Sequence, residues 1–172
     1  HSSYDLFFKK EGLDFGKTEK IINESLRKAD DGELFLEFKQ SESFVYDDKK
    51  IKNASTSTDK GFGLRSVKDE TSAYSHSSDI SETSIKNAGK TVQSILSSSS
   101  KSKIIDPIRT NKKHYSNLNP MNGFSPEQKT KLLKSIDEYA RKLDKRVKQV
   151  SASLHGEWQA VHILRRGGYH CG

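Results

Sequence analysis

Apolar residues repeat with a helical period in two stretches of the N-terminal half. The first predicts a helix over 18–29, which the polar turn at 30–32 ends. The second predicts a helix over 85–96. The candidate N-caps are Thr18 for the first helix and Asp79 or Ser81 for the second. Gly89 costs the second helix about 1 kcal/mol relative to Ala, so we expect another segment to pack closely there.

A third helical stripe follows the clearest local signal in the chain. Ser125 at the N-cap, Pro126 at the first helical position and Gln128 two residues later form a capping box. The spacing behind it predicts a helix over 126–147. The apolar positions of this helix are Leu132, Leu133, Ile136, Ala140, Leu143 and Val147.

Between residues 33 and 76 the apolar period changes to two, which is typical of half-buried strands. The pattern predicts a meander of five short strands at 34–38, 41–46, 50–55, 61–67 and 72–76. The turns between them are expected at Asp47-Asp48, at 57–60 and at 68–70. Gly61 and Gly63 indicate a close backbone approach or a bulge and not a dinucleotide-binding loop, because the third glycine and the following helix are missing. The outer strands of such a sheet offer backbone groups to a partner strand, unless the segment after Ser100 covers them.

Apolar and polar residues alternate again near the C-terminus. Residues 150–154 and 158–164 predict a β-hairpin that turns at Gly156, and 165–168 predict a second turn. The chain is therefore expected to be α+β, with an antiparallel β meander flanked by amphipathic helices and a long linker to a helix plus β-hairpin. We expect a domain at 1–97, an extended linker at 98–124, and at 125–172 the truncated start of a following region.

Composition narrows the choice of function. The 172 residues carry 30 Lys and Arg against 23 Asp and Glu, a formal net charge of +7. This surplus fits either lysine-coated helix faces or contact with nucleic acid, and its densest stretch is 141–148. No apolar run is long enough to span a membrane, and no secretory signal opens the chain. The single cysteine, Cys171, excludes an internal disulfide framework and a multi-cysteine zinc cage.

The sequence motifs predict no catalytic, cofactor-binding or metal-binding residue. His155 lacks the second histidine that a helical zinc motif needs. His162, His170 and Cys171 could ligate a metal only if the chain end folded back, and a frayed terminus is the favoured reading. A catalytic thiolate at Cys171 has only His170 as a candidate activating neighbour. His76 and His114 lie in separate segments without an acidic partner at a telling spacing.

Several segments nevertheless resemble the TldD/PmbA family of bacterial and archaeal metallopeptidases, also called modulators of DNA gyrase. The likeness extends from about Phe15 to Gly167 and favours the TldD branch. It is carried by Leu34-Phe35-Leu36-Glu37-Phe38, by Asp59-Lys60-Gly61-Phe62-Gly63-Leu64-Arg65 and by Asp144-Lys145-Arg146-Val147. After Arg165 the sequence departs from the family pattern. A truncated gene product, a cloned fragment and a frameshifted tail all fit that departure.

The resemblance implies a hydrolase whose zinc is held by a His-Glu-x-x-x-His helix and a further cysteine in the C-terminal half. No His-Glu pair occurs in this sequence, so no catalytic residue is transferred and Cys171 is not matched to the family's ligand. The chain is expected to be the N-terminal, non-catalytic portion, with no cofactor of its own and no activity alone. It would shape a chamber in which small or unfolded peptides are cut. The family further implies a homodimer, or a heterodimer with a PmbA-type paralogue, in the cytoplasm.

A second hypothesis comes from another class of function. In it the chain is a binding module for DNA or for a gyrase-associated protein, without enzymatic activity. The charge of +7 and the basic stretch at 141–148 motivate this alternative.

Overall fold

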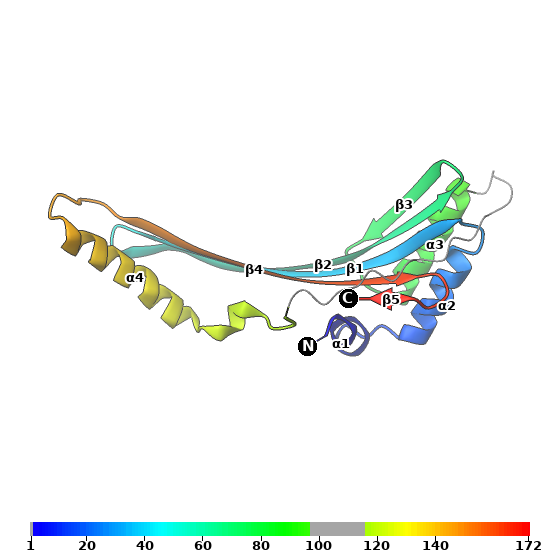
Figure 1. Cartoon of the computed structure of the whole chain (residues 1–172), viewed down its shortest axis with the longest axis horizontal. Coiled ribbons are helices and arrows are strands. Elements are labelled where there is room, and N and C mark those ends of the chain that lie inside the picture. Colours follow the sequence, from blue (N-terminus) through cyan, green and yellow to red (C-terminus); the bar gives the residue numbers. More distant parts are fainter. Residues whose placement is uncertain (1, 97–115) are drawn as a thin grey trace. The chain divides into compact units, whose positions relative to one another are not determined.

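The computed structural model describes residues 2–96 and 116–172 (Figure 1). Five strands form one antiparallel sheet in the order β3-β2-β1-β4-β5, with helices beside it, which confirms the α+β class. In chain order the elements are α1 (Ser3–Asp5), the π-helix η1 (Leu6–Lys10), α2 (Phe15–Ser25), β1 (Asp31–Asp47), β2 (Lys50–Lys68), β3 (Thr71–Ser77), α3 (Glu82–Leu96), the 3-10 helix η2 (Pro120–Gly123), α4 (Pro126–Leu143), β4 (Ser151–Arg165) and β5 (His170–Cys171).

The described residues form two compact units. Unit 1 contains residues from 2–38, 59–96, 116–117 and 160–172. Unit 2 contains 39–58 and 118–159. The long strands β1, β2 and β4 therefore each contribute residues to both units, whereas α2 and α3 belong to unit 1 and α4 to unit 2.

The predicted meander of five short strands is wrong in its strand count, because β1 and β2 each join two predicted strands. The predicted turn at 57–60 lies inside β2. Residues 50–60 are all exposed, so no alternation of apolar and polar residues marks this half of β2. Its serine and threonine residues suit a strand whose faces contact solvent. A cross-strand contact of 2.7 Å between the Ser41 and Ser57 hydroxyls illustrates the continued pairing.

Three turns lie where the sequence predicts them. Asp48 and Lys49 have φ values of 44° and 68°, and they join β1 to β2 as a two-residue turn with positive φ at both positions. Asp69, with φ 52°, turns β2 into β3. Gly167 and Gly168, with φ 85° and 78°, turn β4 back into β5.

The hairpin predicted to turn at Gly156 is wrong, because β4 runs through that residue without a break. The β4–β5 hairpin at the Gly167 turn takes its place, with Ile163 opposite Cys171. A Cβ on Gly156 would lie 2.9 Å from Glu42 Oε1 and 3.2 Å from Met121 Cγ. The glycine therefore serves close packing and not chain reversal.

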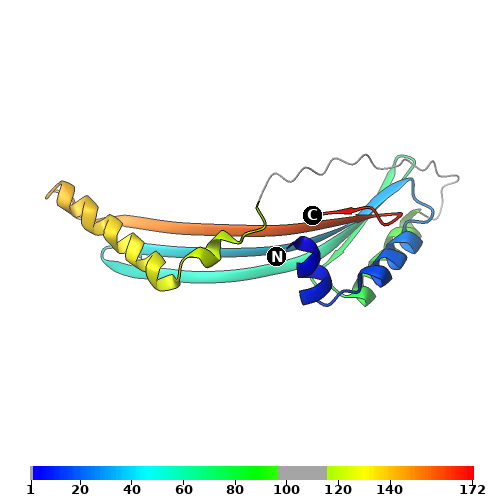
Figure 2. The same ribbon diagram turned by 60° about the horizontal axis from the view of Figure 1, so that its bottom comes forward.

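Helices α2 and α3 of unit 1 pack side by side (Figures 1 and 2). Asp14, and not the expected Thr18, caps α2 by accepting a hydrogen bond of 2.8 Å from the Lys17 amide. Ser81, one of the two predicted candidates, caps α3 by accepting a hydrogen bond from the Ser84 amide. A Cβ on Gly89 would lie 2.9 Å from the Ser25 Cβ, which confirms the close approach expected there. The buried side chains of these helices and of β1 and β2 form the unit 1 core; they include Ile22, Leu26, Leu34, Leu36, Leu64, Ile85 and Val92.

Helix α4 of unit 2 begins with the predicted capping box, in which both reciprocal hydrogen bonds are present. It ends at Leu143 and not at Val147, because Asp144 is extended and its carboxylate accepts a hydrogen bond from the Arg146 amide. Its predicted apolar stripe is only partly buried. Leu133 packs with Phe44 and Tyr46 of β1.

The division into domains at residues 97 and 125 stays a prediction. Most of the predicted linker lies outside the described residues, and its described end contains η2. No described helix combines the length and the apolar character that a membrane crossing requires.

Candidate functional site

A groove of about 850 Å³ lies beside α4 in unit 2. Gln128, Lys131, Leu132 and Ser135 of α4 form one wall. The segment at 120–124 contributes Pro120, Met121 and Phe124, and β4 contributes 154–157. The volume lies in the range of small-ligand and peptide sites, and the apolar side chains are mostly on α4 and η2.

The groove has a buried ion pair at its base. Lys129 Nζ lies 2.7 Å from Glu42 Oε2, and the two side chains are 7% and 10% exposed. The same ammonium donates a hydrogen bond of 2.7 Å to the Met121 carbonyl and lies 5.9 Å from the centre of the Phe44 ring. These contacts fix the η2 segment against β1 and α4, because a buried ammonium must satisfy its donors.

The charge that remains in the groove is positive. Of its two acidic side chains, Glu42 is paired with Lys129, and Glu157 lies 3.0 Å from Lys39. Lys131 lines the groove and has no ion-pair partner among residues 2–96 and 116–172. The wall therefore combines apolar side chains with one uncompensated cation.

Helix α4 carries an apolar stripe on the side that faces away from the sheet. Its members are Leu132, Ile136, Tyr139 and Leu143, which are 53%, 44%, 65% and 68% exposed. The face that packs on β1 and β4 instead carries Lys129, Leu133 and Asp137. Asp137 accepts two hydrogen bonds of 3.1 Å from Arg141 Nε, which explains how a carboxylate is buried there.

The structure places the histidines of the sequence analysis in three different settings. His155 lies on β4 and lines the groove. His76 lies on β3, where its ring centre is 5.8 Å from that of Tyr74. His114 lies outside the described residues. His162 and His170 come together, because β5 folds back onto β4.

His162 is almost fully buried in an aromatic cluster of unit 1, at 2% exposure. Its Nδ1 lies 3.0 Å from the Ser3 hydroxyl, whereas its Nε2 is buried without a hydrogen-bond partner. The rings around the two histidines are those of Tyr4, Phe8 and Phe15. Burial, and secondly the charge of His170, lowers the pKa of His162 to about 4.

This cluster does not fit a metal ion. The rings of His162 and His170 are stacked, with centres 5.2 Å apart and an interplanar angle of 28°. Nearly parallel rings direct their nitrogen lone pairs along parallel planes and not toward one shared point. No group of three or more His, Cys, Asp or Glu in the described part of the chain is arranged to hold a metal ion.

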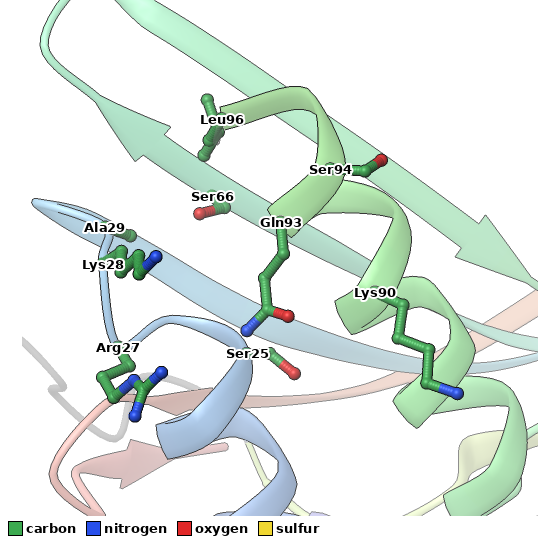
Figure 3. Close-up of a pocket in the computed structure, with 9 residues that line it drawn as sticks. All are labelled: Ser25, Arg27, Lys28, Ala29, Ser66, Lys90, Gln93, Ser94 and Leu96. Atoms are coloured by element: carbon green, nitrogen blue, oxygen red, sulfur yellow. The ribbon is translucent and has the colours of Figure 1, made fainter. Parts of the chain in front are cut away.

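A second pocket, of about 420 Å³, lies between the C-terminal ends of α2 and α3 in unit 1 (Figure 3). Its charged side chains are Arg27, Lys28 and Lys90, and none of the described residues that line it is acidic. Figure 3 shows that Arg27 and Lys90 extend in different directions, so these cations do not converge on one point. Two helix C-termini also direct negative partial charge toward the pocket, which weakens it as an anion site.

The sequence reasoning missed the buried pair of Lys129 and Glu42. One signal was present, since Lys129, Leu133, Asp137 and Arg141 recur every four residues and so share a helix face. A charged row of this kind competes with the apolar stripe for the buried side of the helix, and hydropathy alone favours the stripe.

Comparison with known proteins identifies the fold. Residues 32–98 match the model of the PmbA/TldA metallopeptidase domain 1, and 119–172 match that of the central domain. The metalloprotease TldD homologue of Buchnera aphidicola from Acyrthosiphon pisum is 33% identical over 83% of this chain. The homologue from Haemophilus influenzae is 32% identical over 84%. This chain spans about 30% of the length of each of these relatives.

A solved structure agrees with the fold. TldE from Thermococcus kodakarensis has a TM-score of 0.69 and 18% identity, covering 90% of this chain and 36% of that protein. The matched models describe the first and central domains of metallopeptidases, in the same order as here. The chain belongs to the PmbA/TldD metallopeptidase family.

Proposed function

We propose that this chain is the N-terminal, non-catalytic portion of a TldD-like zinc metallopeptidase that processes small or unfolded peptides. The observation that supports this most is the match to two consecutive family domains within a chain that spans about 30% of its curated relatives. In this proposal the chain shapes the substrate chamber and the dimer interface and supplies no catalytic group.

The zinc is proposed to lie in the part of the whole protein that this sequence does not contain. The donor set supports this, because the 172 residues include no His-Glu pair and the stacked histidines of unit 1 do not converge. When bound, zinc would activate a water for attack on the peptide carbonyl. The residues described above would bind and position peptide.

The assembly is proposed as a homodimer or a heterodimer with a PmbA-type paralogue, in the cytoplasm. The alternative of a DNA-binding or gyrase-associated module finds less support. Arg141 of the basic stretch contacts Asp137 and Asp48, and Arg146 contacts Asp144. These ion pairs leave fewer cations for phosphate, and a salt-sensitive anisotropy titration with duplex DNA would detect any that remain.

A cleavage assay tests the proposal. The purified 172-residue chain is incubated with an unstructured, quenched-fluorescence peptide, with added zinc and with a chelator. We expect no turnover in either condition. Zinc-dependent cleavage that co-purifies with the chain through two columns would contradict the proposal.

A further inference from the structure

We propose that residues 2–11 form an acid-sensitive latch, which opens about Gly12 when His162 takes up a proton. This inference goes beyond the proposed function and does not depend on it. Everything it uses lies within unit 1.

The latch covers His162 from one side. The Ser3 hydroxyl lies 3.0 Å from His162 Nδ1, and the ring centres of Tyr4 and Phe8 lie 6.2 Å and 5.3 Å from that of His162. These three side chains belong to α1 and η1, and α1 lies beside β5 (Figures 1 and 2). His162 is 2% exposed, so water reaches its ring only when part of this cover moves away.

The latch has a hinge and a limited hold on the rest of unit 1. Gly12 follows η1 with φ 86°, and nothing lies within 4 Å of its Cβ position, so the backbone can rotate there without a clash. Leu6 and Phe7 of the latch are 7% and 0% exposed. Their burial keeps the latch closed while His162 is neutral.

A proton on His162 opposes the closed arrangement. The Nε2 atom is buried without a hydrogen-bond partner in the described part of the chain. An imidazolium donates through both ring nitrogens, so the closed latch would leave one donor unsatisfied and bury a charge. Opening the latch lets water solvate the ring, which relieves both costs.

The charges on the surrounding elements do not supply a counterion. The titratable groups there are Tyr4, Asp5, Lys9, Lys10 and Glu11 of the latch, Asp14, Lys17 and Glu19 in and beside α2, Asp31, Glu33 and Glu37 of β1, Arg165 of β4, and His170 and Cys171 of β5. Asp5 is paired with Lys9 at 2.5 Å. Among these described groups only His170 shifts the pKa of His162, and its charge lowers that pKa.

The sign and size of the effect follow from burial. The pKa of His162 is about 4 in the closed fold, first because of burial, against an ordinary value of 6.5. The closed latch is therefore fully favoured above pH 6.5 and is progressively disfavoured as the pH falls toward 4. Because one pKa unit is a factor of ten, the closing equilibrium should fall about thirtyfold between pH 8 and pH 5.

Amide hydrogen exchange of the whole chain, followed by nuclear magnetic resonance at pH 8 and pH 5, tests the inference. Each rate is divided by that of an unstructured peptide at the same pH to give a protection factor. The readouts are the Leu6 amide, which donates to the Ser2 carbonyl at 3.1 Å, and the Glu11 amide, which donates to the Leu6 carbonyl at 2.9 Å. We expect both to be less protected than the amides at 88–92 of α3 at either pH, because the latch opens without global unfolding. Their protection should fall about thirtyfold from pH 8 to pH 5.

Two variants assign the effect to His162. His162→Phe keeps an aromatic ring and cannot titrate, so the protection of the latch amides should change less than about threefold between the two pH values. His76→Phe is the matched control, because His76 is exposed on β3 outside the cluster, and it should keep the full change. Far-ultraviolet circular dichroism establishes that both variants keep the fold. A measurement on the unaltered chain is independent of the variants, since the ring protons of His162 should titrate near pH 4.

Four results would overturn the inference. They are latch amides as protected as those of α3 at both pH values, no loss of their protection at pH 5, an equal loss in His162→Phe, and titration of the His162 ring close to pH 6.5. None of these measurements involves peptide or zinc, so their failure leaves the proposed function untouched.

Discussion

Lys129 is a buried cation on a helix whose outer face is apolar. Its pairing with Glu42 and its hydrogen bond to Met121 explain why a lysine can occupy the buried face. Burying two charges is costly, so such a pair is better understood as positioning η2 against α4 than as a large source of stability.

Removing one partner of the ion pair between Lys129 and Glu42 should strongly destabilise the fold. Lys129→Met leaves the Glu42 carboxylate buried without a partner, and we expect it to lower the free energy of unfolding by about 3 kcal/mol. Lys129→Met combined with Glu42→Leu should recover most of that loss, because no unpaired charge remains. Urea unfolding of the two single variants and the double variant forms the cycle. Additive losses would show that the two side chains do not interact.

His162 makes stability depend on pH. Its pKa is about 4 in the fold against an ordinary value of 6.5, because burial disfavours the imidazolium. The unfolded chain therefore binds the proton first, and stability is full above pH 6.5 and decreases as the pH falls toward 4. At about 1.4 kcal/mol per unit, the total loss is roughly 3 kcal/mol.

The variant His162→Phe should flatten this dependence, because a phenyl ring fits the aromatic cluster and does not titrate. Urea unfolding of both proteins at a series of pH values measures the slopes. Equal slopes between pH 6.5 and 4 would exclude His162 as the cause.

At the scale of elements, local chemistry predicted several element ends, although the cap of α2 and the end of α4 lie elsewhere. The capping box of α4 and the turns at Asp48, Asp69 and Gly167 depend on neighbouring residues, so the sequence displays them directly. The continuity of β2 depends on pairing with other strands along an exposed face, which leaves no apolar signal. The turn predicted at Gly156 is wrong for a related reason, since the side chains that crowd this residue come from β1 and η2.

The groove could not be predicted from the sequence, for the same reason. Glu42, Met121 and Leu132 meet only after β1, η2 and α4 have assembled. The predicted stripe of α4 was an apolar face, but the structure leaves Leu132 and Ile136 partly exposed. Sequence periodicity finds amphipathic helices, whereas it does not say which of two competing faces is buried.

The contact between α2 and α3 gives a prediction at this scale. Gly89→Ala would place a methyl group 2.9 Å from the Ser25 Cβ, so we expect a loss of about 1–3 kcal/mol despite the better helix propensity of alanine. Gly123→Ala is the matched control, because nothing lies within 4 Å of its Cβ position. Thermal unfolding compares them. A stabilising Gly89→Ala would refute the close approach.

At the scale of the whole molecule, the chain belongs to a metallopeptidase family, and its matched segments correspond to the first and central domains. Its proposed contribution is therefore binding and not chemistry. The groove beside α4, with its apolar wall, gives this proposed role a location within unit 2.

Amide hydrogen exchange tests that location most directly. The chain is measured alone and with a saturating unstructured peptide. The account predicts slower exchange at the amides of 154–157, which line the groove, with little change in β3. Unchanged exchange at 154–157 despite peptide binding would contradict it.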